Sequence, residues 1–155
     1  MAEVELLPAA HFEEVRPLLL DLLLEEQGHY SHRQMSRAEI DGGLVGEIRP
    51  AFDGENVILI TRAEGETVGF CLCVIFDPGT GLEGEVAEVY IRPEHRGQGL
   101  ARQLLRRAVE LFQERRVTLG QVWTHPNNPA AIRLYRSAGF APTEQLVMTW
   151  LPEDE

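Results

Sequence analysis

The spacing of apolar residues changes several times along the chain, and each spacing predicts a different element. Apolar residues recur every three to four positions in 10–27, 97–116 and 129–138, which predicts helices, and Ser36 followed by Glu39 predicts a capped short helix at 37–45. Runs rich in β-branched and aromatic residues predict strands at 4–7, 57–62, 67–76, 85–92, 120–124 and 144–150. The resulting order is βααβββαβαβ.

This order predicts an α+β fold, of the three-layer α/β type, in which helices cover both faces of one mixed, mostly antiparallel sheet. Short turns join the three strands between 57 and 92, so these strands are expected to form an antiparallel meander. The strand at 120–124 follows a crossover helix and should run parallel to the strand at 85–92. With 155 residues, the chain is expected to form one domain, 1–155.

The segment after the 85–92 strand has the features of an anion site. Pro93 ends the strand because it lacks an N–H group, and Gly97 and Gly99 let the backbone approach a ligand before the next helix begins. The start of a helix offers free N–H groups and the positive end of its dipole, so a phosphate group is expected here. A plain strand-to-helix turn without a ligand is the alternative. The chain contains no lysine, which excludes a P-loop.

Two segments together carry a resemblance to a known family. The residues RGQGLA at 96–101 follow a strand that ends in VYIRP at 89–93, and NPAAIRLYRSAGF follows at 128–140. In this order and spacing they resemble the GNAT superfamily of acetyl-CoA-dependent N-acetyltransferases. The resemblance covers residues 67–150 well and the N-terminal third in outline. It implies a sheet of six to seven strands and acetyl transfer from acetyl-CoA to a primary amine, whether a small molecule, a peptide N-terminus or a lysine.

The resemblance also implies which residues bind the cofactor. Backbone N–H groups at 96–101 would bind the pyrophosphate of acetyl-CoA, with added charge from Arg96 and Arg102. The backbone of Val89 and Ile91 would pair with the amide-rich arm. Asn128 is implied as a further contact, and its alternative role is a helix cap. The expected cofactor contacts are Val89, Tyr90, Ile91, Arg96, Gly97, Gln98, Gly99, Leu100, Ala101, Arg102 and Asn128.

Acetylation of an amine needs a base for the acceptor and an acid for the leaving thiolate. By the resemblance, Tyr135 donates a proton or a hydrogen bond to the cofactor sulfur, and a tyrosine packed on the sheet is the alternative. Glu88 lies two residues before Tyr90, on the same face of the strand, and is expected to be the base. Glu85, if a bulge turns it to that face, and His125 are the other candidates for the base.

Charge and the N-terminal half bear on the acceptor. The net charge is −11, whereas 92–116 contains seven Arg against three Glu, so a basic region surrounds the proposed phosphate loop. The acidic remainder suits a cationic amine and argues against nucleic acid and anionic membranes as partners, although it is equally typical of a solvated surface. In the family, the region near residue 30 covers the acceptor. Tyr30, His32 and Arg33 are therefore expected to contact substrate, and exposed loop residues are the alternative.

The remaining features concern the surroundings of the protein. No apolar run reaches the ~20 residues of a membrane span, and the acidic start lacks the basic region of a signal peptide, so a cytoplasmic protein is expected. Cys71 and Cys73 are expected to be small core residues, and five scattered histidines predict no metal site. The pattern is compatible with a monomer or a homodimer. A non-catalytic acyl-CoA-binding sensor is the alternative function.

Overall fold

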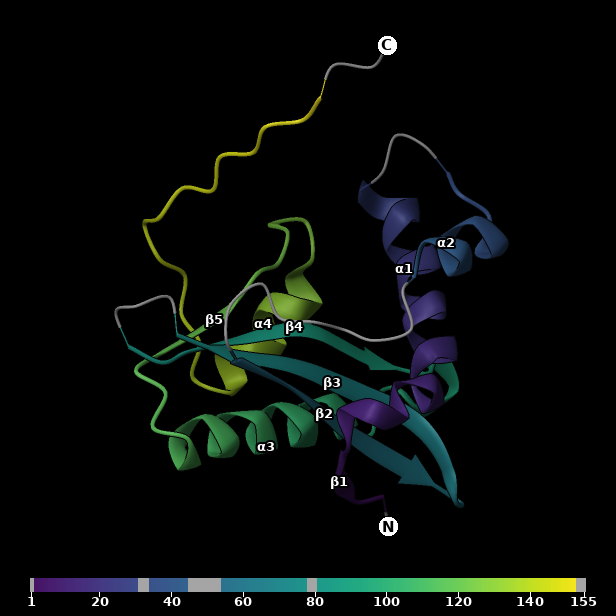
Figure 1. Ribbon diagram of the computed structural model, residues 1–155, viewed down its shortest axis with the longest axis horizontal. Helices are drawn as coiled ribbons and strands as arrows, with labels where there is room; N and C mark the ends of the chain where they lie inside the picture. The colour runs from purple at the N-terminus through teal and green to yellow at the C-terminus, as the bar shows by residue number, and fades with distance from the viewer. Residues whose placement is uncertain (1, 31–33, 45–53, 78–80, 153–155) are drawn as a thin grey trace.

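The computed structural model describes residues 2–30, 34–44, 54–77 and 81–152 (Figure 1). The elements, in chain order, are β1 (Val4–Leu7), the 3-10 helix η1 (Ala9–Glu14), α1 (Arg16–Tyr30), α2 (Arg37–Gly43), β2 (Gly54–Ala63), β3 (Glu66–Phe76), β4 (Glu83–Ile91), the 3-10 helix η2 (Pro93–His95), α3 (Leu100–Glu114), β5 (Leu119–Val122) and α4 (Pro129–Ser137). This is the predicted order up to the last helix. The predicted α+β fold class is confirmed.

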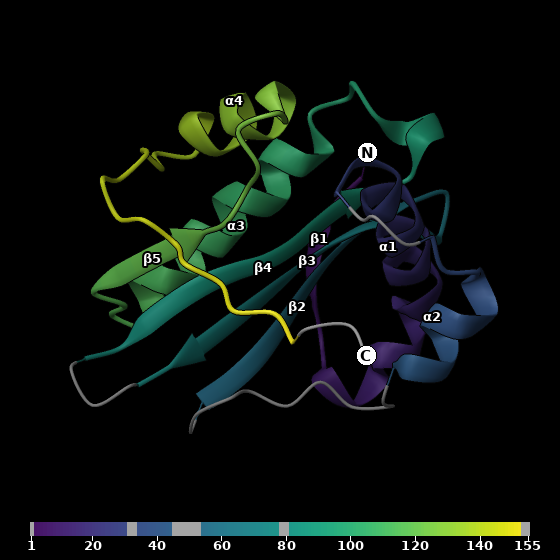
Figure 2. The same cartoon turned by 90° about the horizontal axis from the view of Figure 1, so that it is seen from above.

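The strands form one sheet in the order β1-β2-β3-β4-β5. Strands β1 to β4 pair antiparallel, and β5 pairs parallel with β4, as the meander and the crossover helix predicted. Figure 2 shows α3 and α4 on one side of the sheet and α1 and α2 on the other. The sheet therefore has two buried faces. This explains why its central strand β3 carries a nearly continuous apolar run rather than an alternating one.

Each face of the sheet has its own hydrophobic core. On one face, α3 buries the predicted stripe of Leu100, Leu104, Ala108 and Leu111 against β2, β3 and β4. On the other face, η1 and α1 pack on the sheet, with Phe70 of β3 among the fully buried side chains. Burial of one such large apolar side chain stabilises the fold by about 1.5–3 kcal/mol. The second core packs α1 against Tyr90 of β4, and both elements also line the cavity described below.

The N-terminal helical region differs in detail from its prediction. The helix expected at 10–27 is divided at Val15 into η1 and α1, and Pro17 lies in the first turn of α1, where its missing N–H group costs no helical hydrogen bond. Helix α1 continues to Tyr30, three residues beyond the predicted end at residue 27. A tertiary contact supports this extension, because the Gln27 side chain donates to Met35 O at 2.7 Å and accepts from Met35 N at 2.8 Å. The capping box of α2, formed by Ser36 and Glu39, is confirmed.

Two further expectations are settled by the sheet. Cys71 and Cys73 are free and completely buried in β3, as expected for small core residues. The strand predicted at 144–150 is wrong for the structure described, where this segment forms no ladder and the sheet has five strands instead of six to seven. Its alternating residues suit a strand, but a strand also needs a neighbour to pair with. In the described part of the chain, no helix has the length and apolar character needed to cross a membrane.

Candidate active site

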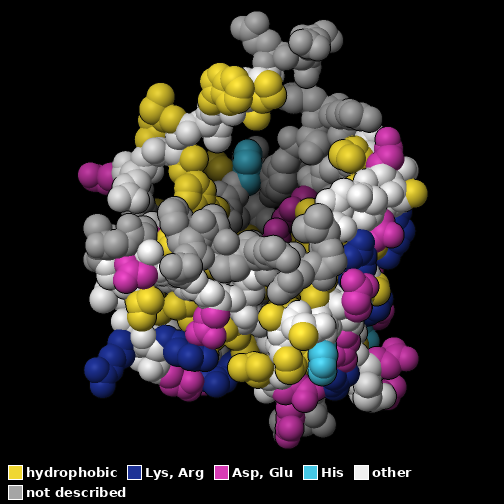
Figure 3. All heavy atoms as spheres, in the orientation of Figure 1, with side chains coloured by type: hydrophobic (Ala, Val, Ile, Leu, Met, Phe, Trp, Pro, Cys, Tyr) yellow, Lys and Arg dark blue, Asp and Glu magenta, His cyan; other side chains and the backbone are white. Residues whose placement is uncertain are grey.

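A cavity opens where β4 and β5 diverge. The parallel ladder spans only Glu83 to Val86 of β4, opposite Leu119 to Val122 of β5. Beyond it, β4 continues to Ile91 while the other chain segment turns towards α4. The space between them is a cavity of about 600 Å³, lined by α1, β4, the segment after β5, and α4. In Figure 3 the molecule is hollowed on this face, with acidic and histidine side chains visible inside the hollow.

A bulge in β4 sets the direction of the carboxylates in this cavity. Leu72 of β3 is opposite Glu88, but its neighbour Cys73 is opposite Val86, so Ala87 is an extra residue in β4. Without the bulge, Glu85 and Glu88 would lie on opposite faces of the strand. The extra residue places both Glu85 and Glu88 on the α1 face of the strand. Glu85 was a candidate base only if such a bulge turned it to the face of Glu88, and this condition is met.

The carboxyl group of Glu88 is strongly perturbed. Burial raises the pKa of Glu88 from 4.5 to about 7, and the nearby charges of Glu26 and Glu85 add to the rise. A carboxyl group with a pKa near neutrality exchanges its proton easily at physiological pH, which is the property expected of a general base. Glu88 also lines the cavity.

Tyr135 reaches the same cavity from α4. Burial raises the pKa of its phenol to about 12, and Cys71, Glu88 and Glu26 contribute further. The ring makes an edge contact with Phe140, with 6.2 Å between the ring centroids. The phenol therefore stays protonated throughout the neutral range. Glu88 and Tyr135 together provide a group that can accept a proton and a group that can donate one.

The start of α4 holds Asn128 at the rim of the cavity. The Asn128 side chain accepts a hydrogen bond from Ala131 N at 3.1 Å, and Pro129 follows it in the first helical position. The helix-cap role of Asn128 is thereby confirmed. Asn128 caps the helix and also lines the cavity. His125, the other candidate base, also lines the cavity, and its Nδ1 accepts from Asn127 N at 3.1 Å.

The predicted phosphate loop has the backbone of an anion site. Gly97 and Gly99 adopt φ values of +77° and +79°, a region that costs other residues strain and glycine little. Gly99 is the N-cap of α3; among the residues that the structure describes, no side chain caps this helix, and its first turn contains no acidic residue. Its first N–H groups are therefore free of competing side chains. Leu100 is buried in the core, so its contribution to a ligand is limited to the backbone.

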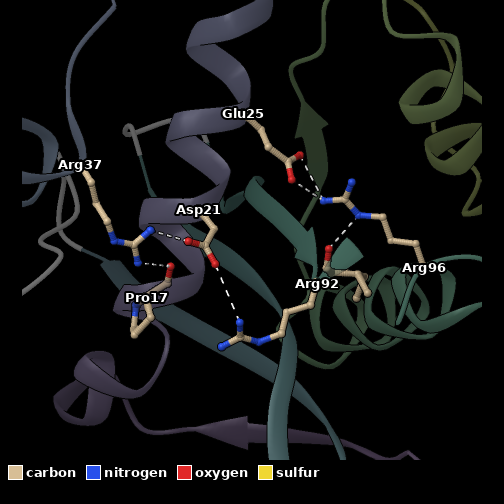
Figure 4. A network of polar contacts seen from close by, with 7 residues as sticks. Pro17, Asp21, Glu25, Arg37, Arg92 and Arg96 are labelled. Atoms are coloured by element: carbon tan, nitrogen blue, oxygen red, sulfur yellow. Dashed lines mark hydrogen bonds and ion pairs between the residues drawn. The ribbon is translucent and has the colours of Figure 1, made fainter. Parts of the chain in front are cut away.

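Arg96 occupies a place that the sequence did not predict. Its Nε donates to Ile91 O at 2.8 Å, and its Nη2 donates to the two carboxylate oxygens of Glu25 at 2.8 Å and 3.1 Å. The guanidinium also lies 5.4 Å from the centre of the Tyr90 ring. Figure 4 shows this side chain reaching from the start of the loop to α1. Arg96 thus links the loop before α3 to α1, which lines the cavity.

A second pair of contacts strengthens this link. The Asp21 carboxylate on α1 accepts a hydrogen bond from Arg37 Nη1 at 2.5 Å (Figure 4). Its other oxygen lies 3.9 Å from Nη1 of Arg92, which follows β4. Arg92 and Arg96 therefore link α1 to the end of β4, and Arg37 links α1 to α2. Exposed ion pairs stabilise little individually, each by about 0–1 kcal/mol, so their effect is chiefly on position.

Glu26 is the main residue that the sequence analysis missed. It lines the cavity from α1, and burial raises its pKa, with Glu25 as a second cause. The adjacent glutamates Glu25 and Glu26 were visible in the sequence near the end of the first helix, but the sequence did not show which of their side chains would face a cavity. Trp123 and Thr124 also line the cavity without having been predicted.

The predicted residues fall into three groups by their position. Those that line the cavity are Glu88, Val89, Tyr90, Ile91, Arg96, Ala101, Asn128 and Tyr135. Those that form the neighbouring loop and first turn of α3 are Gly97, Gln98, Gly99, Leu100 and Arg102. The expected substrate contacts His32 and Arg33, and the side chain of Tyr30, lie outside the described residues. Across the described ranges, no group of three or more His, Cys, Asp or Glu side chains is arranged to hold a metal ion.

This geometry agrees with the comparison with known proteins. Residues 10–140 match the acetyltransferase (GNAT) family. The chain belongs to this family. A GNAT fold explains the diverging parallel strands and the glycine loop before α3 as one arrangement.

The fold is also found in solved structures. An integron cassette protein from the mobile metagenome of V. cholerae aligns with a TM-score of 0.73 and 14% identity over 98% of this chain and 93% of that one. An aminoglycoside N-acetyltransferase in complex with CoA aligns with a TM-score of 0.68 and 18% identity over 97% of this chain and 95% of that one.

Curated relatives of this GNAT chain are acetyltransferases. Mycothiol acetyltransferase of Nocardiopsis dassonvillei is 31% identical over 129 residues, which is 80% of this chain and 39% of the relative. An uncharacterized N-acetyltransferase of Archaeoglobus fulgidus is 32% identical over 85 residues, which is 52% of this chain and 56% of the relative. The chain thus spans well under half the length of the mycothiol acetyltransferase.

Proposed function

We propose that this protein transfers an acetyl group from acetyl-CoA to a primary amine, which attacks the thioester directly. The observation that carries the proposal is that Glu88 and Tyr135 line the same cavity, beside the N-terminus of α3, which no described side chain caps. One group has its pKa near neutrality and the other is protonated at neutral pH. Membership of the acetyltransferase family supports the same reaction.

The residues present fit acetyl-CoA as the donor. The N-terminus of α3, with Gly97 and Gly99 in left-handed conformations, suits a pyrophosphate group. The backbone of β4 beyond Val86 has no β5 ladder in the structure described and faces the cavity, so it suits an amide-rich arm. When bound, acetyl-CoA supplies the acyl group and a thiolate leaving group. Backbone N–H groups of β4 at the same place are suited to stabilise the developing negative charge on the carbonyl oxygen.

The acidic lining of the cavity suits a cationic acceptor. Glu25, Glu26 and Glu88 all line it, while the charge of Glu25 is partly neutralised by Arg96. An amine arrives as an ammonium ion, because free primary amines have a pKa well above neutrality. Glu88 then takes a proton from the ammonium, directly or through a water molecule, and frees the lone pair for attack. Glu85 and His125 are the alternative bases.

Tyr135 serves as the general acid. The leaving thiolate gains a proton as the carbon–sulfur bond breaks, and a phenol whose pKa is about 12 remains protonated until that moment. Tyr135 lines the cavity from α4, and Glu26 lines it from α1. The acceptor amine therefore binds on the α1 side of the cavity, near Glu26 and Glu88. The acceptor class is a small-molecule amine, a peptide N-terminus or a lysine.

The experiment that tests this function combines two measurements on one sample. Calorimetry measures the affinity for acetyl-CoA, and a thiol reagent measures CoA release with a panel of monoamines, diamines, amino sugars and peptides. We expect binding together with thiol release for at least one amine. Binding without release across the panel would instead support the acyl-CoA sensor, and absence of binding would reject both functions.

A further inference from the structure

The ion pair between Arg96 and Glu25 joins two walls of the cavity. Arg96 lies directly after η2, at the start of the glycine loop, and Glu25 lies on α1; both side chains line the cavity. Figure 4 shows the guanidinium between the Glu25 carboxylate and the end of β4. The pair therefore stands between the loop proposed for the cofactor phosphates and the wall proposed for the acceptor.

The part of Arg96 that can meet a phosphate is its side chain. The backbone N–H group of Arg96 donates to Pro93 O at 3.2 Å, within the turn of η2, and is therefore already used. The guanidinium also has a partner, because its Nη2 donates to both oxygens of Glu25. A phosphate that binds at the loop thus meets an arginine whose charge is shared with a carboxylate on α1.

The ion pair has a geometry that a stronger anion can displace. Both hydrogen bonds come from the single nitrogen Nη2, at 2.8 Å and 3.1 Å, whereas the strongest arginine–carboxylate pairs use two nitrogens side by side. Both side chains are nearly half-exposed to solvent, which further weakens their attraction. A pyrophosphate carries more negative charge and more acceptor oxygens than one carboxylate. It therefore draws the guanidinium away from Glu25.

The charge of Glu25 acts inside the cavity. It is the second cause, after burial, that raises the pKa of the neighbouring Glu26, which also lines the cavity. While Arg96 is paired with Glu25, its positive charge offsets this carboxylate. Once the guanidinium is engaged by a phosphate, Glu25 attracts an ammonium group on the α1 side of the cavity.

We propose that Glu25 and the pyrophosphate of acetyl-CoA compete for the guanidinium of Arg96, so that cofactor binding turns Glu25 into a binding group for a positively charged acceptor. This inference rests on the proposed function and concerns the same cavity. The bond from Arg96 Nε to Ile91 O and the contact with the Tyr90 ring keep the guanidinium close to both anions. The coupling is reciprocal: an ammonium group on Glu25 releases Arg96 to the pyrophosphate, so each ligand strengthens the binding of the other.

The first test is the affinity for acetyl-CoA of the variant Glu25→Gln, measured by calorimetry at pH 8. Competition predicts that loss of this cavity carboxylate makes the cofactor bind about three- to fivefold more tightly, because Arg96 is no longer shared. Fivefold corresponds to about 1 kcal/mol, the upper value for an exposed ion pair. An unchanged or weaker affinity would overturn the proposal.

Two further variants show whether the gain passes through Arg96. Glu26→Gln is the matched control, since it removes a carboxyl group from the next position of α1 in the same cavity, and the affinity for acetyl-CoA should stay unchanged. In an Arg96→Gln background, the additional change Glu25→Gln should have no effect on this affinity, because the shared guanidinium is gone. Equal gains in Glu25→Gln and Glu26→Gln, or a gain that persists without Arg96, would show a general effect of charge and would contradict the competition.

The second test concerns the acceptor and uses the amine of the panel that gives the fastest thiol release. In Glu25→Gln the KM for this amine should rise at least threefold while the KM for acetyl-CoA falls. An unchanged KM for the amine would overturn the role of Glu25 towards the acceptor. Failure of the proposed function has a different signature. If acetyl-CoA binds but no amine reacts, the catalytic function and the acceptor role of Glu25 are rejected, whereas calorimetry alone decides the competition for Arg96. If the unmodified chain does not bind acetyl-CoA, both proposals are rejected.

Discussion

Replacement of Glu26 by Gln should shift the acid side of the pH–rate profile to lower pH. Burial and the charges of Glu26 and Glu85 hold the pKa of Glu88 near 7 instead of 4.5. Glu26→Gln keeps the size and most of the packing of the side chain but removes its negative charge. Less repulsion favours the ionised form of Glu88, so the pKa of the proposed base falls.

The size of the shift follows from the order of the causes. Burial is the largest cause of the raised pKa of Glu88, and Glu26 comes second, so its removal accounts for less than half of the rise. We expect a pKa of about 6 for Glu88 in the variant. At pH 6 the ionised fraction of Glu88 would then rise from about one tenth to about one half, so kcat/KM relative to its plateau should increase about fivefold. At pH 8 the relative rates should agree.

The assay is initial-rate thiol release between pH 5 and 9, with the profile of each protein scaled to its own plateau. This scaling separates the pKa of the base from any loss of affinity for a cationic acceptor. Glu110→Gln is the matched control, because it makes the same charge change on α3, away from the cavity. An acid limb that stays in place in Glu26→Gln, or that moves to higher pH, would refute the assignment of Glu88 as a base coupled to Glu26.

Three further predictions concern single residues. Tyr135→Phe should lower kcat about a hundredfold while the affinity for acetyl-CoA changes little, measured by thiol release and calorimetry; an unchanged kcat would remove Tyr135 from the mechanism. Gly99→Val should weaken acetyl-CoA binding roughly 5- to 150-fold, because φ is +79° and a β-branched residue there costs about 1–3 kcal/mol, whereas Gly99→Asn tolerates this conformation and should bind more tightly than Gly99→Val; equal affinities of the two variants would reject the phosphate loop. Glu88→Gln should reduce turnover but increase thermal stability at pH 8. The folded-state pKa of Glu88 lies above the unfolded value, so folding takes up a proton between pH 4.5 and about 7 and stability falls as the pH rises through that window. The partly solvated carboxylate should cost about 1–2 kcal/mol above it, and a Tm at pH 8 equal to that of the unmodified chain would contradict this.

Local features of the fold were predictable because their causes lie within a few residues. The stripe of α3, the capping box at Ser36 and the cap at Asn128 all depend on neighbours three or four positions away. The meander followed from strands joined by short turns. These parts of the sequence specify their structure without reference to the rest of the chain.

The bulge in β4 was not predictable in the same way. It is a mismatch between two strands, so Ala87 becomes an extra residue only once β3 fixes the register. The sequence could state what a bulge would do to Glu85, but not that one exists. The contact between Arg96 and Glu25 joins positions 71 residues apart and depends on where α1 packs. Glu26 was missed for the same reason.

The final strand shows a different limit. Residues 144–150 have the composition and alternation of a strand, yet in the described chain they stand extended without a ladder. Periodicity indicates which conformation a segment favours, but pairing depends on a partner strand.

The most direct test of the central claim is mass spectrometry of an amine acceptor after incubation with acetyl-CoA and the protein, with Glu88→Gln and Tyr135→Phe in parallel. The account predicts that the amine gains one acetyl group in the presence of the unmodified protein, and far more slowly with either variant. Acetylation that proceeds equally well with both variants would contradict the assignment of the cavity between β4 and β5 as the active site.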